Sequence, residues 1–491
     1  MDSIKSRAFS STIWKFLERF SNQLMSMVIQ IIIARILVPA DYSVISIVTI
    51  FFAFANVFIS GGFNVALIQK KNASEREYSA VLYTSLLVSA VLYIILYFVA
   101  PTIAVLYEQP LLVPVIRVMA LVLPVNAVKS IWCAYISSHL QFKKFFFSTL
   151  GGTICSGAVG IVMALSGFGA WALVAQQMSV SVIGTLILIF TTRIRLVLKI
   201  SLRELKTLFR YGWKVFVSSI ISTVYTELTP IIIGLKYSNE DLAFYTKGRG
   251  YPQLLTSSTT TTLSAVMFPV MAKYQDDKEK LLRYTRLFIR LSSYLAFPIM
   301  IGFLAVSENF VRVLLTDKWL PAVPYIKIFC IASMFDMIHI GNCETIKAMG
   351  KSGTYLIMEI IKKTAYFITI FAFLFFTDSP VYFALSAIAC TLIAVVVNSI
   401  PNQKILGYTL GKQLADLIPN LLSASAMYLV VSFIGISLKN SLAPFPTLLI
   451  QILCGVLFYA FVSLLTKNPS FFYLLRTFKE MIFSKKKGSE K

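Results

Sequence analysis

The chain has 491 residues, of which 57% are hydrophobic and only 14% are charged. Because soluble proteins carry about 25% charged residues, this composition excludes an ordinary water-soluble globular protein and indicates apolar surfaces that face lipid. The formal net charge of +23 would suit a nucleic-acid-binding protein. The basic residues, however, lie mostly in short segments between apolar runs, which argues against nucleic acid as a partner.

The N-terminal region shows no cleavable signal peptide, because its first apolar stretch continues past Gln30 and is too long for a signal sequence. The six cysteines fall inside apolar segments without a CxxC or Cys/His pairing, which is typical of small packing residues. Imidazole groups come from His139 and His339 alone. The sequence therefore predicts no metal centre and no cofactor.

Apolar runs long enough to cross a membrane recur along the whole chain. A spanning helix needs about 20 mainly apolar residues, and the sequence contains about fourteen such runs. Their length and their lack of strict alternation predict helices rather than barrel strands, and no segment between them is long enough for a soluble domain. The predicted spans are 12–36, 44–68, 80–105, 111–137, 146–166, 169–191, 209–235, 243–270, 287–312, 322–346, 355–376, 380–401, 414–436 and 444–466.

Basic residues are distributed unevenly over the loops between these spans. With both termini on the cytoplasmic side, the loops on that side hold most of the loop lysines and arginines, whereas the outer loops hold Lys236, Lys318 and Lys439. One miscounted span would destroy this segregation, so the positive-inside rule supports both the number of spans and the orientation. Residues 470–491 are basic and amphipathic, which predicts a tail on the anionic inner leaflet.

The first and seventh spans each carry polar residues along one helical face, at three- or four-residue steps. We predict that both faces line a water-filled cleft between two helical bundles. The alternative is that they join helices through interhelical hydrogen bonds. The residues are Ser11, Lys15, Glu18, Arg19, Asn22, Ser26 and Gln30 in the first span, and Arg210, Lys214, Ser218, Ser222, Thr226 and Pro230 in the seventh.

Two pairs of segments indicate an internal repeat. IIIARILVPADYSVI begins at Ile31 and IIIGLKYSNEDLAFY begins at Ile231, and PVIRVMAL (114–121) resembles PYIKIFCI (324–331) in the same order. Because an even number of spans separates the copies, both keep one orientation, which predicts two parallel six-helix bundles suited to alternating access. The predicted division is 1–200 and 201–408 for the bundles, 409–469 for two additional spans and 470–491 for the tail.

At these residues the chain resembles the Wzx-type polysaccharide flippases of the MOP superfamily, in particular the lipopolysaccharide, teichuronic-acid and colanic-acid type exporters. The chain departs from the family at Ser43, where a glycine often follows the Asp-aromatic pair, and Ala243 occupies that place in the second copy. The resembling stretches include ARILVPADYSVISI (34–47), GFGAWALVAQQ (167–177), VMFPVMAKYQDDKEKLLR (266–283) and ENFVRVLLTDKWLPAVPYIKIFC (308–330).

The resemblance implies the MOP-flippase fold, an all-α integral membrane protein whose two bundles form a V, and a transporter rather than an enzyme. It implies a substrate of sugar repeat units on undecaprenyl pyrophosphate, moved to the outer leaflet of the bacterial cytoplasmic membrane for surface polysaccharide synthesis. Membrane lipids and a polysaccharide polymerase are the implied partners. Two alternatives stay open, a multidrug-type exporter of the same superfamily and a membrane glycan polymerase or ligase.

Basic residues inside the spans are candidates for substrate binding, because a charge near the bilayer centre costs about 2.5–3.5 kcal/mol and Arg and Lys bind phosphate oxygens through charge-assisted bonds. We predict an inner site of Lys15, Arg19 and Lys214, with Asn22 on the same cleft-lining face. We predict an outer site of Arg35, Lys247 and Arg249, for which snorkelling at the outer mouth is the alternative.

Acidic residues inside the spans are candidates for coupling to an H⁺ or Na⁺ gradient, because a buried acid can change its protonation state during transport. The alternative for each is an ion pair, as for Glu359 with Lys362 or Lys363. Arg286, Arg290 and Arg312 lie near span ends, where they are expected to snorkel. The coupling candidates are Glu18, Glu227, Asp336 and Glu344.

Overall fold

The structure is a computed structural model that describes residues 2–476 apart from twelve positions within that range. It describes the backbone but not the side chain of some helical residues, among them Lys15 and 202–211. The predicted tail therefore lies outside the described residues beyond Arg476. The positions left out are Gly61, Lys71, Asn72, Leu140, Arg193, Arg195, Leu196, 198–201 and Asn440.

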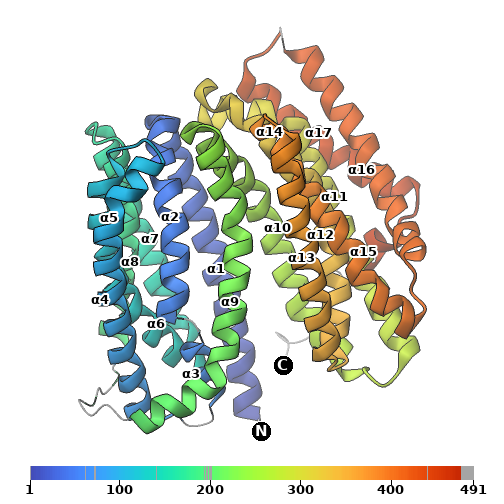
Figure 1. The fold of residues 1–491 in the computed structure, drawn as a ribbon. Coiled ribbons are helices and arrows are strands. Elements are labelled where there is room, and N and C mark those ends of the chain that lie inside the picture. Colours follow the sequence, from blue (N-terminus) through green and yellow to red (C-terminus); the bar gives the residue numbers. More distant parts are fainter. Residues whose placement is uncertain are drawn as a thin grey trace, which may run out of the picture. The chain divides into compact units, whose positions relative to one another are not determined.

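The chain divides into two compact units, Met1–Thr246 and Lys247–Lys491, and its described residues form helices and no strands (Figure 1). α10 (Asn239–Lys273) begins in the first unit and continues into the second. The other helices of the first unit are α1 (Asp2–Ile36), α2 (Pro39–Ser60), α3 (Phe63–Gln69), α4 (Glu75–Leu106), α5 (Leu112–Ala120), α6 (Val122–Ser138), α7 (Phe142–Leu165), α8 (Ala170–Thr191) and α9 (Leu202–Lys236).

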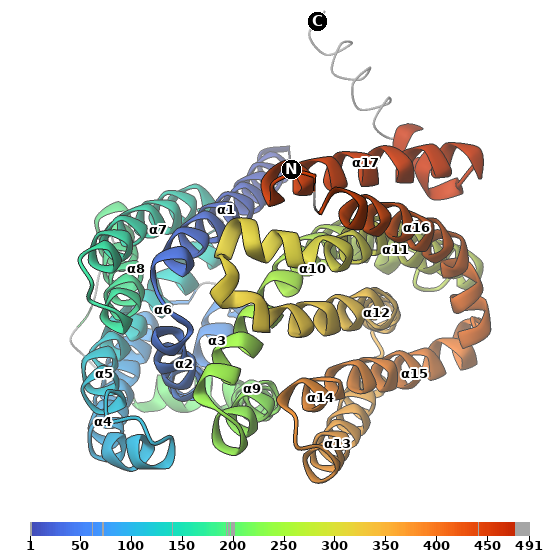
Figure 2. The ribbon, with the colours of Figure 1, turned by 90° about the horizontal axis from the view of Figure 1, so that it is seen from above.

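In the second unit, α16 and α17 pack along α11, as the view from above shows (Figure 2). A single π-helical turn, η1, follows α11, and a short 3₁₀ segment, η2, leads into α12. The elements are α11 (Lys278–Phe310), η1 (Val311–Leu315), η2 (Asp317–Ala322), α12 (Val323–Ala348), α13 (Ser352–Phe376), α14 (Pro380–Ala384), α15 (Ser386–Leu406), α16 (Leu410–Leu438) and α17 (Pro444–Leu465).

Within the described residues, 11 helical segments are long and apolar enough to cross a membrane. Each coincides with a predicted span, so the chain is an all-α, multi-pass membrane protein, as predicted. The other predicted spans also form helices, α1, α10 and α13, but these are more polar. α13 carries Glu359, Lys362 and Lys363, and α10 carries a run of hydroxyl residues at 256–262.

The sequence repeat is accompanied by a repeat of local structure. α1 and α9 are both 35 residues long, and each is followed by a two-residue link into the next helix. The Asp41 carboxylate accepts a hydrogen bond from the Val38 amide at 3.1 Å, and Asp241 accepts one from the Ser238 amide at 3.3 Å. Both carboxylates therefore cap the start of a helix in the same way.

The family's glycine position needs no glycine in this chain. Ser43 and Ala243 lie inside α2 and α10, after the link rather than within it, and both are buried. Helical backbone accepts either residue, and the Ser43 hydroxyl donates to the Ala40 carbonyl at 2.7 Å. The departure from the family therefore leaves the link intact.

The first unit is packed through glycines that let helices approach closely. Gly62, at φ +88°, lies against Gly212 of α9, where an added Cβ would stand 2.1 Å from the Gly212 carbonyl oxygen. α7 and α8 meet at Gly152 and Gly184, where a Cβ on Gly152 would be 3.2 Å from the Gly184 Cα. Small residues at helix interfaces are typical of membrane proteins, because lipid offers no hydrophobic drive to association.

The division between the units lies later in the chain than the predicted boundary at 200 and 201. α9 packs against α2, α3 and α4, and the Gly62–Gly212 contact fixes that crossing. The helix that opens the second sequence repeat thus belongs to the first compact unit. The six-helix bundles defined by the repeat stay a prediction.

The second unit is packed through buried polar side chains. Asn402 donates to the Asn342 Oδ1 at 2.7 Å, and Asn342 donates to the Gln413 Oε1 at 2.8 Å. All three are fully buried, and they join α15, α12 and α16. Asn420 of α16 adds a bond to the Ser293 hydroxyl of α11 at 2.8 Å.

Candidate functional site

The first unit presents exposed basic side chains on two of its long helices. Arg19 and Arg35 of α1 and Lys214 of α9 are exposed, whereas the side chain of Lys15 lies outside the described residues. A cation that faced hydrocarbon would be unfavourable by about 2.5–3.5 kcal/mol near the bilayer centre. These exposed cations therefore fit a wet surface or an anionic ligand better than lipid tails.

Glu18 differs from its neighbour Arg19 because its side chain is buried, with a relative exposure of 7%. The Cys133 thiol of α6 lies within electrostatic range of both Glu18 and Lys129, which brings an acid of α1 near a base of α6. Sequence reasoning did not single out Lys129. The signal was available, since a lysine occurs in the middle of an otherwise apolar span at 111–137.

Asn22 takes part in helix packing. Its side-chain oxygen accepts a hydrogen bond from the Thr153 hydroxyl of α7, so the helix-joining alternative holds for this residue. Glu227 on α9 is half-buried. On the predicted polar face of α9, Ser218 and Ser222 are exposed, whereas Thr226 is half-buried and Pro230 is buried.

In the second unit, the side chain of Lys247 is buried and is not exposed at the surface. Its exposed fraction is 9%, and its Nζ lies 5.8 Å from the ring centroid of the fully buried Trp319, within range of a cation–π interaction. A Cβ on the adjacent Gly248 would stand 2.4 Å from the Tyr325 Cβ, so α10 presses directly on the start of α12. Arg249 is half-buried.

Asp336 and His339 form a pair on α12, with the His339 Nε2 3.2 Å from the Asp336 Oδ1. The His339 Nδ1 is buried and has no hydrogen-bond partner among the residues that the structure describes. The Tyr366 hydroxyl on α13 lies within electrostatic range of Asp336 and of Glu359. These titratable groups of α12 and α13 therefore form one cluster inside the second unit.

The other predicted acids of this unit are held in ion pairs. Glu344 binds Lys347 at 3.2 Å, which is the alternative considered for it. Glu359 binds Lys362, which confirms the predicted pair. Lys362 has a side-chain exposure of 6%. The ion pair therefore compensates the charge of a buried lysine in the middle of α13.

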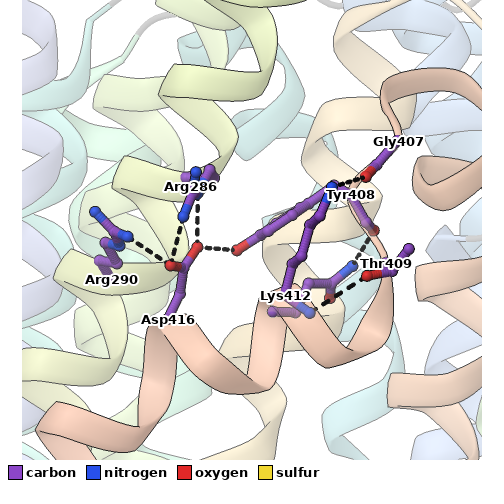
Figure 3. A network of polar contacts seen from close by, with 8 residues as sticks. Arg286, Arg290, Gly407, Tyr408, Thr409, Lys412 and Asp416 are labelled. Carbon is purple, nitrogen blue, oxygen red and sulfur yellow. Dashed lines mark hydrogen bonds and ion pairs between the residues drawn. The ribbon is translucent and has the colours of Figure 1, made fainter.

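Arg286 and Arg290 remain partly exposed, and both also bind the carboxylate of Asp416 on α16, a structural role that snorkelling alone does not describe (Figure 3). Arg286 makes two bonds of 2.8 Å, through Nε and Nη2, and Arg290 adds one through Nη2. The Tyr408 hydroxyl donates a fourth at 2.8 Å. Burial raises the pKa of Tyr408, so this hydroxyl keeps the proton that it donates.

Asp416 was absent from the predicted site although it is an acid inside a predicted span. Its side chain is only 4% exposed, and its partners lie far away in sequence. Arg312, which was also expected to snorkel, binds Glu308 at 3.1 Å and Asp317 at 2.7 Å around η1. Several basic residues near span ends thus bind acidic residues, and the distribution of charges over the loops did not predict these ion pairs.

Comparison with known proteins gives a match to the profile of the family "Polysaccharide biosynthesis protein" over residues 32–324, more than half of the chain. An uncharacterized membrane protein in the cps region of Klebsiella pneumoniae is 26% identical over 68% of this chain and 70% of its own length. The succinoglycan biosynthesis transport protein ExoT of Rhizobium meliloti is 20% identical over 96% and 95% of the two chains. The lipopolysaccharide biosynthesis protein WzxC of Escherichia coli is 25% identical over 30% of this chain and 29% of its own.

Solved structures share the fold. The lipid II flippase MurJ, in an inward closed conformation, superposes with a TM-score of 0.75 over 94% of this chain and 99% of its own, at 16% identity. An inward-facing multidrug resistance MATE transporter of the MOP superfamily gives a TM-score of 0.59 over 84% and 98%, at 12% identity. The architecture is therefore the MOP fold.

Proposed function

Because the chain belongs to the polysaccharide biosynthesis protein family, we propose that it moves oligosaccharide repeat units linked to undecaprenyl pyrophosphate across the bacterial cytoplasmic membrane. It is a flippase-type transporter of the MOP superfamily rather than an enzyme. The family match carries the proposal, because it extends from the first compact unit into the second. The relatives named for succinoglycan transport and lipopolysaccharide biosynthesis support a glycan cargo.

Basic residues would hold the pyrophosphate. A charged, hydrated head group cannot cross hydrocarbon unaided, and guanidinium and ammonium groups replace its water with charge-assisted bonds. We assign Arg19 and Lys214, whose side chains are exposed on long helices, to the inner site together with Lys15. Their exposure is the property that a ligand for an incoming phosphate requires.

Arg35, Arg249 and Lys247 are the outer site in this proposal. Arg249 is the better candidate for direct contact, because Lys247 is buried against Trp319. The two sites would be used in turn by alternating access, with the N- and C-termini on the cytoplasmic side, as the distribution of loop charge favours.

The Asp336–His339 pair is our proposed site of H⁺ coupling. The His339 Nδ1 is buried without a hydrogen-bond partner among the described residues, so a proton added there would change the polar network. Glu359, Lys362 and Tyr366 are the charged or titratable neighbours on α13. Glu344 is a weaker candidate because Lys347 neutralises it. Glu18 and Glu227 stay candidates, and coupling to Na⁺ is the alternative.

A flipping assay tests the proposal. The full chain is reconstituted in proteoliposomes with a fluorescent undecaprenyl-pyrophosphate-linked oligosaccharide, and the fraction that becomes accessible on the opposite leaflet is measured with time. We expect Arg19→Ala to abolish flipping with no loss of folded protein. Lys439→Ala removes a basic residue from a loop outside the site and serves as the matched control, with flipping retained.

Three results would each contradict a part of the proposal. Absence of flipping by the wild type with every lipid-linked oligosaccharide tested would remove the function. Full flipping by Arg19→Ala and Lys247→Ala together would remove the cationic site while leaving the function in place. A His339→Gln variant that responds to a pH gradient as the wild type does would move the coupling site elsewhere.

A further inference from the structure

The Arg286–Arg290–Asp416 cluster has more hydrogen-bond donors than its own acceptor can use. Asp416 already accepts from Arg286 twice, from Arg290 once and from Tyr408 once, which fills about four lone-pair sites on its two oxygens. Each guanidinium has about five N–H donors, so most donors of the two arginines point elsewhere. The three charged groups together carry a net positive charge.

The spare donors are accessible. The Arg286 and Arg290 side chains are 41% and 38% exposed, although Asp416 is only 4% exposed. Figure 3 shows the two guanidiniums on different sides of one carboxylate, with Tyr408 approaching from α16's preceding loop. Further basic residues follow on the same elements, since Arg283 and Lys412 are exposed one turn nearer the starts of α11 and α16.

The predicted spans 287–312 and 414–436 begin within a few residues of Arg286, Arg290 and Asp416. Asp416 is about 9 Å along α16 from its first residue, Leu410, at about 1.5 Å per residue. α11 has 33 residues and is therefore about 50 Å long, well beyond the roughly 30 Å of the hydrocarbon core. Since the predicted span on α11 starts at residue 287, the excess length at its start would place Arg286 near the boundary between acyl chains and head groups.

We propose that Arg286 and Arg290 bind the phosphate of an anionic glycerophospholipid in the leaflet where α11 and α16 begin. The phosphate would take the guanidinium donors that Asp416 leaves unused, and the acyl chains would lie in the adjacent hydrocarbon. This lipid is a resident of the protein and not its cargo. It would bridge α11 to α16 and so fasten the two additional helices to the second unit.

Lipid retention tests the site. The full chain is purified from nanodiscs of phosphatidylcholine and phosphatidylglycerol in a 3:1 ratio, and bound lipid is counted by native mass spectrometry. Arg290→Gln keeps the two Arg286 bonds to Asp416 and therefore the fold. We expect this variant to retain roughly fivefold less phosphatidylglycerol than the wild type, since a charge-assisted contact is lost. Lys412→Gln, which removes an equal charge from a side chain bonded to the Gly407 carbonyl, is the matched control and should retain it.

Three results would overturn the proposal. Equal retention by Arg290→Gln and the wild type would show that the arginines hold no lipid. Equal loss in Lys412→Gln would reduce the effect to general surface charge. Displacement of the lipid by millimolar inorganic phosphate would identify a site for free anions. A rise in the unfolding temperature with phosphatidylglycerol, seen in the wild type and absent in Arg290→Gln, would support the site independently of mass spectrometry.

Discussion

The two compact units solve the same packing problem with different chemistry. In the first unit, helices meet where side chains are missing, at Gly62 against Gly212 and at Gly152 against Gly184. In the second unit, helices are also joined by hydrogen bonds between buried polar side chains, among them Asn342, Asn402, Gln413 and Asp416. Close backbone approach depends on dispersion contacts, whereas polar pairing depends on each buried group having its partner.

This difference determines how each unit should fail. At Gly62 the first unit has no room for added atoms, so a single methyl group is expected to disrupt that helix crossing. The second unit also has a close approach, at Gly248 against Tyr325, but its buried polar network makes it sensitive to changes of polarity as well, because a lost partner leaves a buried donor or acceptor unsatisfied. Substitutions that add a methyl group and substitutions that delete a polar group therefore test whether the two units differ in this way.

Gly62→Ala should have the largest effect. It combines a backbone at φ +88° with a Cβ that would stand 2.1 Å from the Gly212 carbonyl oxygen, and the expected loss of unfolding free energy is about 2–5 kcal/mol. The measurement is an SDS titration of folded protein in dodecyl maltoside. Gly350→Ala is the control, since its φ is +69° with no atom within 4 Å of the added Cβ. Equal losses would show that backbone strain, and not close approach, is responsible.

Asp416→Ala should follow. Removing one partner of a fully buried ion pair costs about 3–5 kcal/mol, but Arg286 and Arg290 are 41% and 38% exposed and can turn towards water. The expected loss is therefore roughly 2–3 kcal/mol, measured by the same titration. Asp276→Ala, at an exposed residue of the loop before α11, should stay within about 0.5 kcal/mol of the wild type. An equally small loss for Asp416→Ala would mean that the cluster does not hold α16.

The same contrast explains what sequence reasoning could find. The helices were predictable because long apolar runs are a local property, and the Glu359–Lys362 pair was predictable because both residues lie on one helical face. The Asp416 cluster was not, because Arg286 is 130 positions away in the chain and nothing local indicates which helix α11 will meet. Asp416 itself could have been predicted as a functional or structural residue, since an acid within an apolar span is costly unless it has a partner. The glycine crossings likewise depend on tertiary contact.

Asn402→Ala should cause a moderate loss of stability, and it tests the role of polar pairing in the second unit. It removes the donor to the Asn342 side chain at 2.7 Å and to its backbone carbonyl at 3.2 Å, in a fully buried site. The expected loss is about 1–2 kcal/mol. The matched variant in the first unit is Asn126→Ala, whose amide donates to Asn56 at 3.1 Å from a partly buried position. A loss there as large as at Asn402 would contradict the view that polar pairing matters more in the second unit.

The smallest predicted effect concerns the local structure that the two sequence repeats share. Asp41 and Asp241 each accept a backbone amide at the link between two long helices, and removal of such a cap costs about 0.5–2 kcal/mol. Asp41→Ala and Asp241→Ala should therefore lower stability by similar amounts in the same SDS titration. Asp241 also accepts from the Ser238 hydroxyl at 2.7 Å, so its loss should be the greater by a few tenths of a kcal/mol. If one substitution were neutral and the other destabilising, the two links would share their geometry but not their contribution to stability. The two units would then differ even at the segments that their sequences share.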